Sequence, residues 1–408
     1  MKKKASKELM KDINFRVILR KIFENGEISR ASLAKTTGLS AATVSKIVSE
    51  QMDAGIVSEV GSEISTGGRK PILLSINPSF KIVYGVKIGL GYINLVITDL
   101  NGKLLLSGIE QTEPQIRPEK VVELVAGSLD RMRRSLAMPA DRLLGIGLAV
   151  SGVVDPVAGI VRNSFLLEWE DVPIRQLIEQ RVGAKTYVMN DVDSFSLAQM
   201  WKGKARNYRN AVFITLGSGV GGAIFLEGNL YSSRGGTGEI GHMTVVKDGR
   251  KCTCGSRGCL EAEASFEALA NDIWKFSKTR EVQRLYEEMK RTESSELEFI
   301  REALRIEGSM DEAFRNYSEI IGIALKNVVN IFAPEYILIG GEALEFKDHY
   351  LKESIEICKV NSFGRIVQGV TFDIDEMGEL AWVLGAVYRV IEDTLFTVST
   401  SLTGEVLE

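Results

Sequence analysis

Apolar residues near the N-terminus recur at the three- and four-residue spacing of amphipathic helices. In the first helix the repeating positions are Phe15, Ile18, Leu19, Ile22 and Phe23, and Asn25-Gly26 marks its end. Ser29 is placed to cap a second helix over residues 30–36, and Ser40 to cap a third. The inner face of the third helix consists of Val44, Ile47, Val48 and Met52. Three short helices, with Gly38 in the turn between the second and the third, predict a helix-turn-helix.

The outward face of the third helix is small and polar, as a helix that enters the major groove needs to be. Its residues are Ala41, Ala42, Thr43, Ser45, Lys46 and Ser49. Residues 56–60 and 71–76 read as two strands of a wing, and the loop between them carries two basic residues. We therefore predict DNA contacts from Ser40, Ala42, Thr43, Ser45, Lys46, Arg69 and Lys70. The alternative is a three-helix packing module with a solvated charged loop.

From residue 81 onward, short β-rich runs alternate with helical patterns. We expect strands over 82–88, 93–99, 103–106, 143–149, 187–190, 210–216, 220–226 and 336–339. A helix is expected over 119–137, and residues 263–334 read as largely helical. This mixture favours an α/β body over a helical bundle or a β-sandwich. The last dozen residues read as a weakly held tail.

Length and composition limit the class of protein. A chain of 408 residues that is 45% hydrophobic should fold into two or three globular units. With 25% charged residues it matches ordinary globular proteins, which excludes disorder for most of the chain. No apolar run approaches the ~18 residues that a membrane span needs, and the basic start lacks the apolar core of a signal peptide. We therefore expect a cytoplasmic protein without a membrane partner.

The net charge of −4 combines two regions of opposite sign. Residues 1–75 hold 13 Lys and Arg against 8 Asp and Glu, a net charge of +5. The remaining residues hold 37 against 46, a net charge of −9. A small basic head on a larger acidic body indicates that only the head meets a polyanion.

A glycine-rich loop follows the strand predicted over 210–216. Gly217, Gly219 and Gly222 satisfy the letters of GxGxxG, but a dinucleotide-binding fold also requires a helix directly afterwards. A strand follows instead, so we predict a strand–loop–strand hairpin. The loop Gly217-Ser218-Gly219 can bind a phosphate through backbone N–H groups. The alternative is a tight turn that needs glycine only for a positive φ.

Three of the four cysteines lie within eight residues, at Cys252, Cys254 and Cys259. In a reducing compartment such a cluster indicates a metal site rather than a disulfide framework. His242, one of only two histidines, completes a Cys₃His set that suits closed, tetrahedral zinc. With no open position the metal would be structural. The alternative is that the cysteines are reduced and pack as small hydrophobic residues.

The run from Gly238 to His242, followed by CxCGxxGCLE from Cys252 to Glu261, resembles the signature of the ROK family of sugar kinases and transcriptional repressors. The STGGRKP segment of the wing is similar to the head of its repressor branch. The resemblance spans essentially the whole chain. It implies a winged helix-turn-helix over 1–78 and a two-lobed, actin-like (ribonuclease H-like) sugar kinase fold. The first lobe would comprise 79–188 with 379–400, and the second 189–378.

The resemblance also implies a sugar pocket. Its residues would be Asn163, Asn190, Asp191, Glu239, His242 and Glu261. In the kinases of the family the aspartate that matches Asp191 is the catalytic base, so Asp191 would be catalytic here only if kinase activity persists. Carboxylate and amide groups suit neighbouring sugar hydroxyls, and a carboxylate can deprotonate an attacking hydroxyl.

The first phosphate motif departs from the family pattern. The kinases begin their core with an Asp-x-Gly-Gly-Thr turn, but here Lys87 takes the place of the aspartate and Leu90-Gly91 that of Gly-Thr. A lysine reverses the charge that organises Mg²⁺, and Leu90 is bulky beside a backbone meant to approach phosphate. We therefore expect no ATP or Mg²⁺. Lys87 would join the loop Gly217–Gly219 in binding a phosphate on the effector, or would extend to solvent.

These features together predict a sugar-responsive transcriptional regulator, acting as a repressor. Its partners would be operator DNA, a sugar or sugar-phosphate effector, and a second copy of the chain in a homodimer or a dimer of dimers. Effector binding would close the lobes and alter the spacing of the two heads. One alternative is an active ATP-dependent sugar kinase with a DNA-binding head. Another is a scaffold whose sugar pocket is vestigial.

Overall fold

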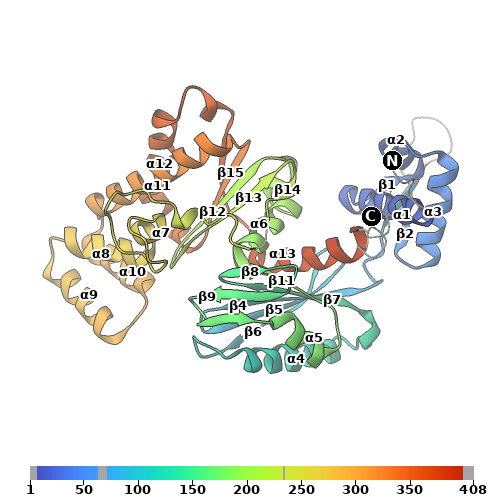
Figure 1. The fold of residues 1–408 in the computed structure, drawn as a ribbon, viewed down its shortest axis with the longest axis horizontal. Helices are drawn as coiled ribbons and strands as arrows, with labels where there is room; N and C mark the ends of the chain where they lie inside the picture. The colour runs from blue at the N-terminus through green and yellow to red at the C-terminus, as the bar shows by residue number, and fades with distance from the viewer. Residues whose placement is uncertain (1–6, 63–70, 233–234, 398–408) are drawn as a thin grey trace. The chain divides into compact units, whose positions relative to one another are not determined.

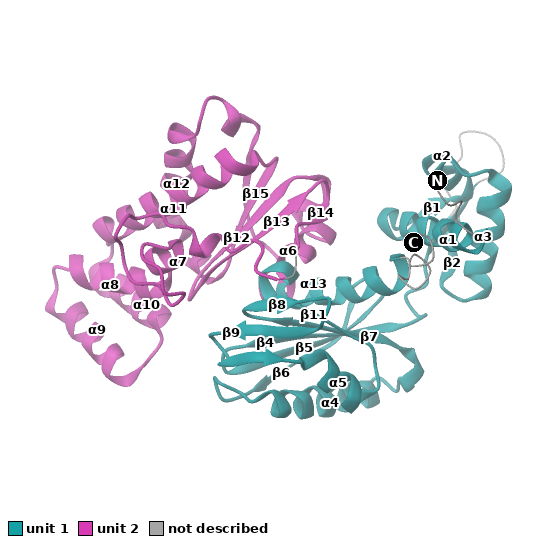
Figure 2. Ribbon diagram, in the orientation of Figure 1, with its two compact units in different colours: residues 1–194, 382–408 teal, residues 195–381 magenta. Residues whose placement is uncertain are grey.

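A computed structural model of the chain describes residues 7–62, 71–232 and 235–397. The chain falls into two compact units, one of residues 1–194 and 382–408, the other of residues 195–381 (Figure 2). We call residues 7–76 the head, residues 82–194 with 382–397 the first lobe, and the second unit the second lobe. The head and the first lobe lie in the same unit, and their division near residue 78 stays a proposal.

The head combines three helices with a three-stranded sheet (Figure 1). Its elements are α1 (Lys7–Asn25), α2 (Arg30–Thr37), α3 (Ala41–Asp53), β1 (Ile28–Ser29), β2 (Val57–Ser62) and β3 (Ile72–Ile76). The Ser29 and Ser40 hydroxyls accept hydrogen bonds from the N–H groups of residues 32 and 43, and Gly38 has a φ of +72°. The predicted helices, caps and wing strands are confirmed. The sequence patterns missed β1, which pairs with β3.

The first lobe is built on a five-stranded sheet of order β11-β7-β4-β5-β6. Its strands are β4 (Ile82–Gly89), β5 (Tyr92–Asp99), β6 (Leu104–Gln111), β7 (Leu143–Val150) and β11 (Thr186–Asn190). β4 is antiparallel to β5 but parallel to β7, and β7 is parallel to β11. The carboxyl ends of β4, β7 and β11 therefore meet at one edge, which carries Lys87 and Asn190.

Helices cover both faces of this sheet (Figure 1). α4 (Pro118–Ser135) and α5 (Ile174–Val182) pack against the large apolar side chains of one face, such as Tyr84 and Val86. α13 (Glu379–Ile391) lies on the other face, where β4 and β7 present Gly85 and Gly147. A Cβ atom at Gly85 would lie 2.7 Å from the Val387 side chain, and one at Gly147 would overlap the carbonyl of residue 386. Helix and sheet therefore meet almost backbone to backbone.

A second, smaller sheet completes the first lobe. It joins β8 (Val153–Asp155), β9 (Ile160–Ser164) and β10 (Trp169–Val172) in antiparallel order. The sequence patterns did not predict these three strands, which have three, five and four residues. The Trp169 indole donates a hydrogen bond to the carbonyl of Ile116 at 2.9 Å, which fixes this sheet to the segment before α4.

The second lobe contains a sheet of order β14-β13-β12-β15-β16 and a group of helices. Its strands are β12 (Ala211–Leu216), β13 (Val220–Leu226), β14 (Asn229–Leu230), β15 (Tyr336–Gly340) and β16 (Thr371–Ile374). Its helices are α7 (Leu260–Ala264), α8 (Phe266–Phe276), α9 (Arg280–Thr292), α10 (Glu296–Glu307), α11 (Asp311–Phe332) and α12 (Lys347–Asn361), after α6 (Asp191–Trp201), which starts in the first lobe.

The two lobes confirm the predicted α/β class. β12 and β13 form an antiparallel hairpin, so the prediction of a hairpin rather than a dinucleotide-binding turn is also confirmed. Ile214 and Ile339 of the second sheet share an apolar core with Phe314 and Ile321 of α11. Within the described ranges, no helix is both long and apolar enough to cross a membrane.

Candidate functional site

The exposed face of α3 carries most of the residues predicted to contact DNA. Ala42, Ser45 and Lys46 are exposed, and Thr43 is half-buried. The Ser40 hydroxyl accepts a hydrogen bond from the Thr43 N–H at 3.1 Å, so Ser40 fixes the start of α3 whether or not DNA is bound. Arg69 and Lys70 lie outside the described residues. The structure thus presents a small, polar helix face, and its contact with DNA stays a prediction.

Asn190 and Asp191 lie where β11 passes into α6. The Asn190 side chain donates to the carbonyl of Gly152 at 2.9 Å and accepts from the Val192 N–H at 2.8 Å. These bonds hold the turn that carries Asp191. Burial raises the pKa of Asp191, and the Lys87 ammonium and the N–H of Val192 oppose that rise. Asn190 therefore has a positioning role in addition to the sugar contact that the resemblance implies.

Lys87 lies at the carboxyl end of β4, in the electrostatic range of Asp191. It is only 7% exposed, so the alternative that it extends to solvent is wrong. Its Nζ atom lies 4.1 Å from the centre of the Trp382 ring and 5.8 Å from that of Tyr92, in cation–π contact. Two aromatic rings thus flank the ammonium group, which also acts electrostatically on the Asp191 carboxylate.

The turn after β4, which corresponds to the first phosphate motif of the kinases, is filled by a side chain. The Tyr92 ring packs over Gly89, where any Cβ atom would overlap it. Leu90 projects outward and is 48% exposed. The side chain that closes this turn is therefore Tyr92, whereas the sequence drew attention to Leu90.

Asn163 belongs to β9 and lies opposite Val153 and Glu170. Gly152 has a φ of +103° and packs so closely on the Asn163 carbonyl that a Cβ atom would overlap it. Because the Gly152 carbonyl is also the acceptor for Asn190, the structure brings Asn163 and Asn190 together around this glycine. Asp191 and Lys87 complete the first-lobe half of the candidate site.

The glycine loop of the second lobe lies between β12 and β13. Gly217, Gly219 and Gly222 are absent from the glycines with a positive φ, so the alternative of a turn that needs glycine for φ is wrong. Glycine is required by close packing: a Cβ atom at Gly222 would lie 2.6 Å from the carbonyl of Gly238. The loop is thus built for close approach by neighbouring groups.

Two carboxylates occupy the surroundings of this loop. Glu342, directly after the Gly340-Gly341 pair that ends β15, holds its carboxylate where a Cβ atom at Gly217 would be. The Glu261 carboxylate accepts a hydrogen bond from the Val220 N–H at 3.2 Å. Negative charge beside backbone N–H groups opposes the binding of a phosphate. Glu342 was not recognised from the sequence, although its place after Gly-Gly was visible.

The predicted metal ligands converge. The ligand atoms of His242, Cys252, Cys254 and Cys259 all lie within 4.8 Å of one another, with Nδ1 of His242 at 3.6 Å from Sγ of Cys252. The arrangement fits a single tetrahedral ion. The backbone around Ser256 lowers the pKa of Cys254, while burial raises the pKa of Cys259 to about 12. A bound dication would favour the thiolate form of both.

The loop that carries the cysteines turns at Gly255 and Gly258, which have φ values of +92° and +69°. A Cβ atom at Gly258 would overlap the carbonyl of Val246. The loop leads directly into α7, and its last residue, Cys259, precedes Leu260 and Glu261. A metal at this place would therefore fix Glu261 as well as His242.

The remaining sugar-site candidates surround this loop. Glu239 is exposed and starts the short helical turn η3 (Ile240–His242), where its carbonyl accepts from the His242 N–H at 3.1 Å. With Nδ1 directed at Cys252, His242 keeps Nε2 for another partner. The structure places Glu239, His242 and Glu261 in the second lobe and Asn163, Asn190 and Asp191 in the first. Their joint contact with a sugar stays a prediction.

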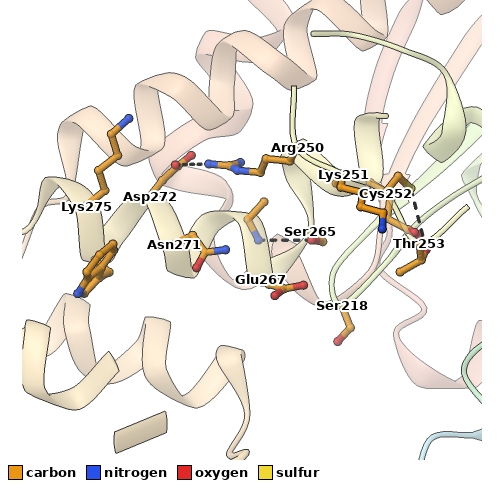
Figure 3. Close-up of a pocket in the computed structure, with 14 residues that line it drawn as sticks. Ser218, Arg250, Lys251, Cys252, Thr253, Ser265, Glu267, Asn271, Asp272 and Lys275 are labelled. Carbon is orange, nitrogen blue, oxygen red and sulfur yellow. Dashed lines mark hydrogen bonds and ion pairs between the residues drawn. The ribbon is translucent and has the colours of Figure 1, made fainter. Parts of the chain in front are cut away.

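A hollow of about 490 Å³ runs along α8, from the glycine and cysteine loops near the start of the helix toward Lys275 near its end (Figure 3). One end is lined by Ser218, Cys252 and Thr253, and the opposite end by Lys275. Arg250 also lines it but is paired with Asp272 and Glu263. The charges of the hollow are therefore largely balanced, and it shows no concentration of positive charge for an anion.

Comparison with known proteins finds a matching family and similar repressors. The ROK family matches residues 83–390. A putative xylose repressor of Caldicellulosiruptor sp. (strain Rt8B.4) is 31% identical over 389 residues, which cover 95% of this chain and 97% of the relative. The match therefore includes the head as well as both lobes.

Two solved structures share the fold. A ROK family transcriptional regulator, described as a homologue of the Escherichia coli MLC protein, superposes with a TM-score of 0.79 at 23% identity, over 98% of this chain and 99% of that one. A ROK family glucokinase from Streptomyces griseus, solved with glucose and AMPPNP, gives a TM-score of 0.63 at 25% identity. It covers 76% of this chain and 98% of the glucokinase. The actin-like kinase fold predicted for the body is confirmed.

Proposed function

The chain belongs to the ROK family, and we propose that it is a sugar-responsive transcriptional repressor that binds operator DNA through its head. The observation that carries the proposal is the head itself: α3 presents an exposed, small and polar face, capped by Ser40, on a helix-turn-helix with a wing. Similarity to a xylose repressor over 95% of the chain supports it. A homodimer would place two heads on half-sites related by two-fold symmetry, in the cytoplasm where the DNA lies.

The effector would be a sugar bound by the carboxylate and amide groups of the two lobes. Neighbouring hydroxyls suit Asp191 and Asn163 from the first lobe and Glu239, His242 and Glu261 from the second. Lys87 is buried against the Trp382 and Tyr92 rings, which favours a neutral sugar over a sugar phosphate. A zinc ion held by His242, Cys252, Cys254 and Cys259 would keep the second-lobe residues in place and take no part in chemistry.

The same residues argue against phosphoryl transfer. Lys87 brings a positive charge to the place where the kinases hold Mg²⁺ with an aspartate, and Tyr92 fills the first phosphate turn. Glu342 brings a carboxylate to the second phosphate loop, at Gly217. We therefore propose that the body binds sugar without phosphorylating it.

DNA binding in the presence of sugars tests the proposal. A labelled duplex is selected with the full-length protein from a random-sequence library, and its Kd is measured by fluorescence anisotropy with and without each sugar of a panel. The panel contains D-xylose, D-glucose, amino sugars and the corresponding sugar phosphates. We expect one neutral sugar to weaken DNA binding about 5- to 150-fold. Sequence-independent binding, or binding that no sugar alters, would contradict the proposal.

The intact Asp191 favours a second candidate, an ATP-dependent sugar kinase with a DNA-binding head. The discriminating measurement is ADP release with ATP, Mg²⁺ and the same sugars. We expect no release above that of the Asp191→Asn variant. Turnover that Asp191→Asn abolishes would establish the kinase and overturn the non-catalytic assignment.

A further inference from the structure

One helix of the first lobe, α13, has chemically distinct contacts at its two ends. Near its start, the Trp382 ring stacks on the Lys87 ammonium at 4.1 Å, and Lys87 in turn acts on Asp191. The Ser194 hydroxyl donates to the Trp382 carbonyl at 2.7 Å and ties the same turn of α13 to α6. This end of α13 therefore contacts the residues that flank the candidate sugar carboxylate.

The other end contacts the head. After α13 the chain continues as a π-helical turn, η6 (Glu392–Phe396). Phe23 of α1 packs against Phe396 and Tyr388, with ring centres 5.0 and 6.3 Å apart. Arg20 forms an ion pair with Glu392, and the Arg16 guanidinium donates to the carbonyl of Thr394 at 3.3 Å. Helix α1 of the head is thus fastened to the end of α13 by aromatic and charged contacts.

Between its ends α13 has little freedom to deform. It packs on Gly85 and Gly147 of the sheet and, through Gly385, on the backbone of Ser194, where a Cβ atom would overlap. Contacts this close oppose bending of the helix between its ends, because a bend would drive backbone into backbone. The 13 residues of α13 span about 20 Å at the usual rise per residue. A displacement at one end would reach the other with little loss.

We propose that α13 is the element that couples the sugar site to the DNA-binding head, with the Lys87–Trp382 contact at its sensing end and the Phe23–Phe396 contact at its output end. The inference rests on the proposed function. A sugar hydroxyl that binds Asp191 would alter the electrostatic surroundings of Lys87, and with them the position of the ammonium group over the Trp382 ring. That change shifts the equilibrium of the head only if the sugar binds the two arrangements with different affinity.

Two variants test the coupling, one at each end. Trp382→Leu removes the ring that holds Lys87, and Phe23→Ala removes the ring that α1 presents to Phe396. The ratio of DNA Kd with and without saturating D-xylose, or D-glucose where xylose is silent, is compared with that of the wild type. Isothermal titration gives the sugar Kd of each protein. We expect both variants to bind sugar while their DNA ratio falls below about 2, from about 5–150 in the wild type.

Trp274→Leu serves as the matched control, since Trp274 is a half-exposed tryptophan of α8 that stacks on Tyr286. Its DNA ratio should equal that of the wild type. A wild-type ratio in either test variant overturns the inference. Loss of sugar binding in Trp382→Leu does so too, because Trp382 would then belong to the binding site. Where Trp382→Leu does not fold, Phe23→Ala decides. An unresponsive wild type refutes the proposed function itself, and the inference with it.

Discussion

Cys252, Cys254, Cys259 and His242 show how four side chains can organise a loop that has little regular structure of its own. Between η3 and α7, the described backbone is held by two isolated β-bridges and a few turn hydrogen bonds. Cys254 is exposed, whereas Cys252 and Cys259 are buried, so the cluster reaches from the interior to the protein surface. A metal ion that joins all four would supply the cross-links that packing does not.

We expect purified protein to contain about one zinc per chain and Cys259→Ser to lose it. Without the ion the loop frees His242 and Glu261, and the melting temperature should fall by about 5–10 °C. Metal content by plasma mass spectrometry and thermal melts with and without chelator provide the measurement. Cys358→Ser is the control, since Cys358 is buried in α12 of the same lobe and outside the cluster. Equal zinc content in the two variants would count against the ligand set.

Lys87 shows which properties of a residue can be recognised in the sequence and which cannot. Its charge reversal relative to the kinases was visible, but its burial was not, because the rings around it come from Tyr92 in the next strand and Trp382 near the C-terminus. Glu342 is similar: a glutamate after Gly-Gly has no evident role until β15 brings it to Gly217. The side chains are local, whereas their surroundings are assembled from distant segments.

Among the elements, α13 depends most on the glycines of its neighbours. Gly85 and Gly147 lie within strands, where glycine is otherwise unfavourable because it contributes no side chain to packing. Their use is explained by the helix that crosses them at backbone distance. The alternation of large and absent side chains along β4 thus assigns α4 to one face and α13 to the other.

Gly147→Ala should test this packing directly. The added methyl overlaps the carbonyl of Ala386, so α13 must move, at a cost of about 1–3 kcal/mol. We expect the melting temperature to fall by about 3–10 °C in a thermal melt. Gly108→Ala is the matched control: Gly108 lies in β6 of the same sheet, with nothing within 4 Å of the added atom. A Gly147→Ala protein as stable as the Gly108→Ala protein would exclude the close packing.

Over the whole molecule, the net charge differs in sign between the head and the body. Residues 1–75 carry a net charge of +5 and the rest of the chain −9. The excess of carboxylates in the body disfavours its contact with DNA, so the phosphate contacts should come from the head alone. This division predicts that the salt dependence of DNA binding is set by lysines and arginines of the head.

Lys46→Ala should therefore weaken binding to all DNA sequences alike. Lys46 is exposed on α3, and its loss should reduce the slope of log Kd against log salt by about 1 for each head that is bound. Anisotropy titrations between low and physiological salt measure the slope. Lys352→Ala, an exposed lysine of α12 in the body, should leave the slope unchanged. Equal slopes for Lys46→Ala and the wild type would remove Lys46 from the phosphate contacts.

The amino-acid sequence by itself determined the elements and chemistry that depend on short-range spacing: the caps and apolar faces of the head, the α/β alternation, the hairpin at Gly217, and a cysteine loop whose ligands lie close along the chain. Only the tertiary structure decided which distant groups meet. It placed Trp382 on Lys87, Glu342 at the glycine loop, and Phe23 against Phe396. The physical reason is that spacing fixes local backbone geometry, whereas long-range contacts follow from how strands pair and helices pack.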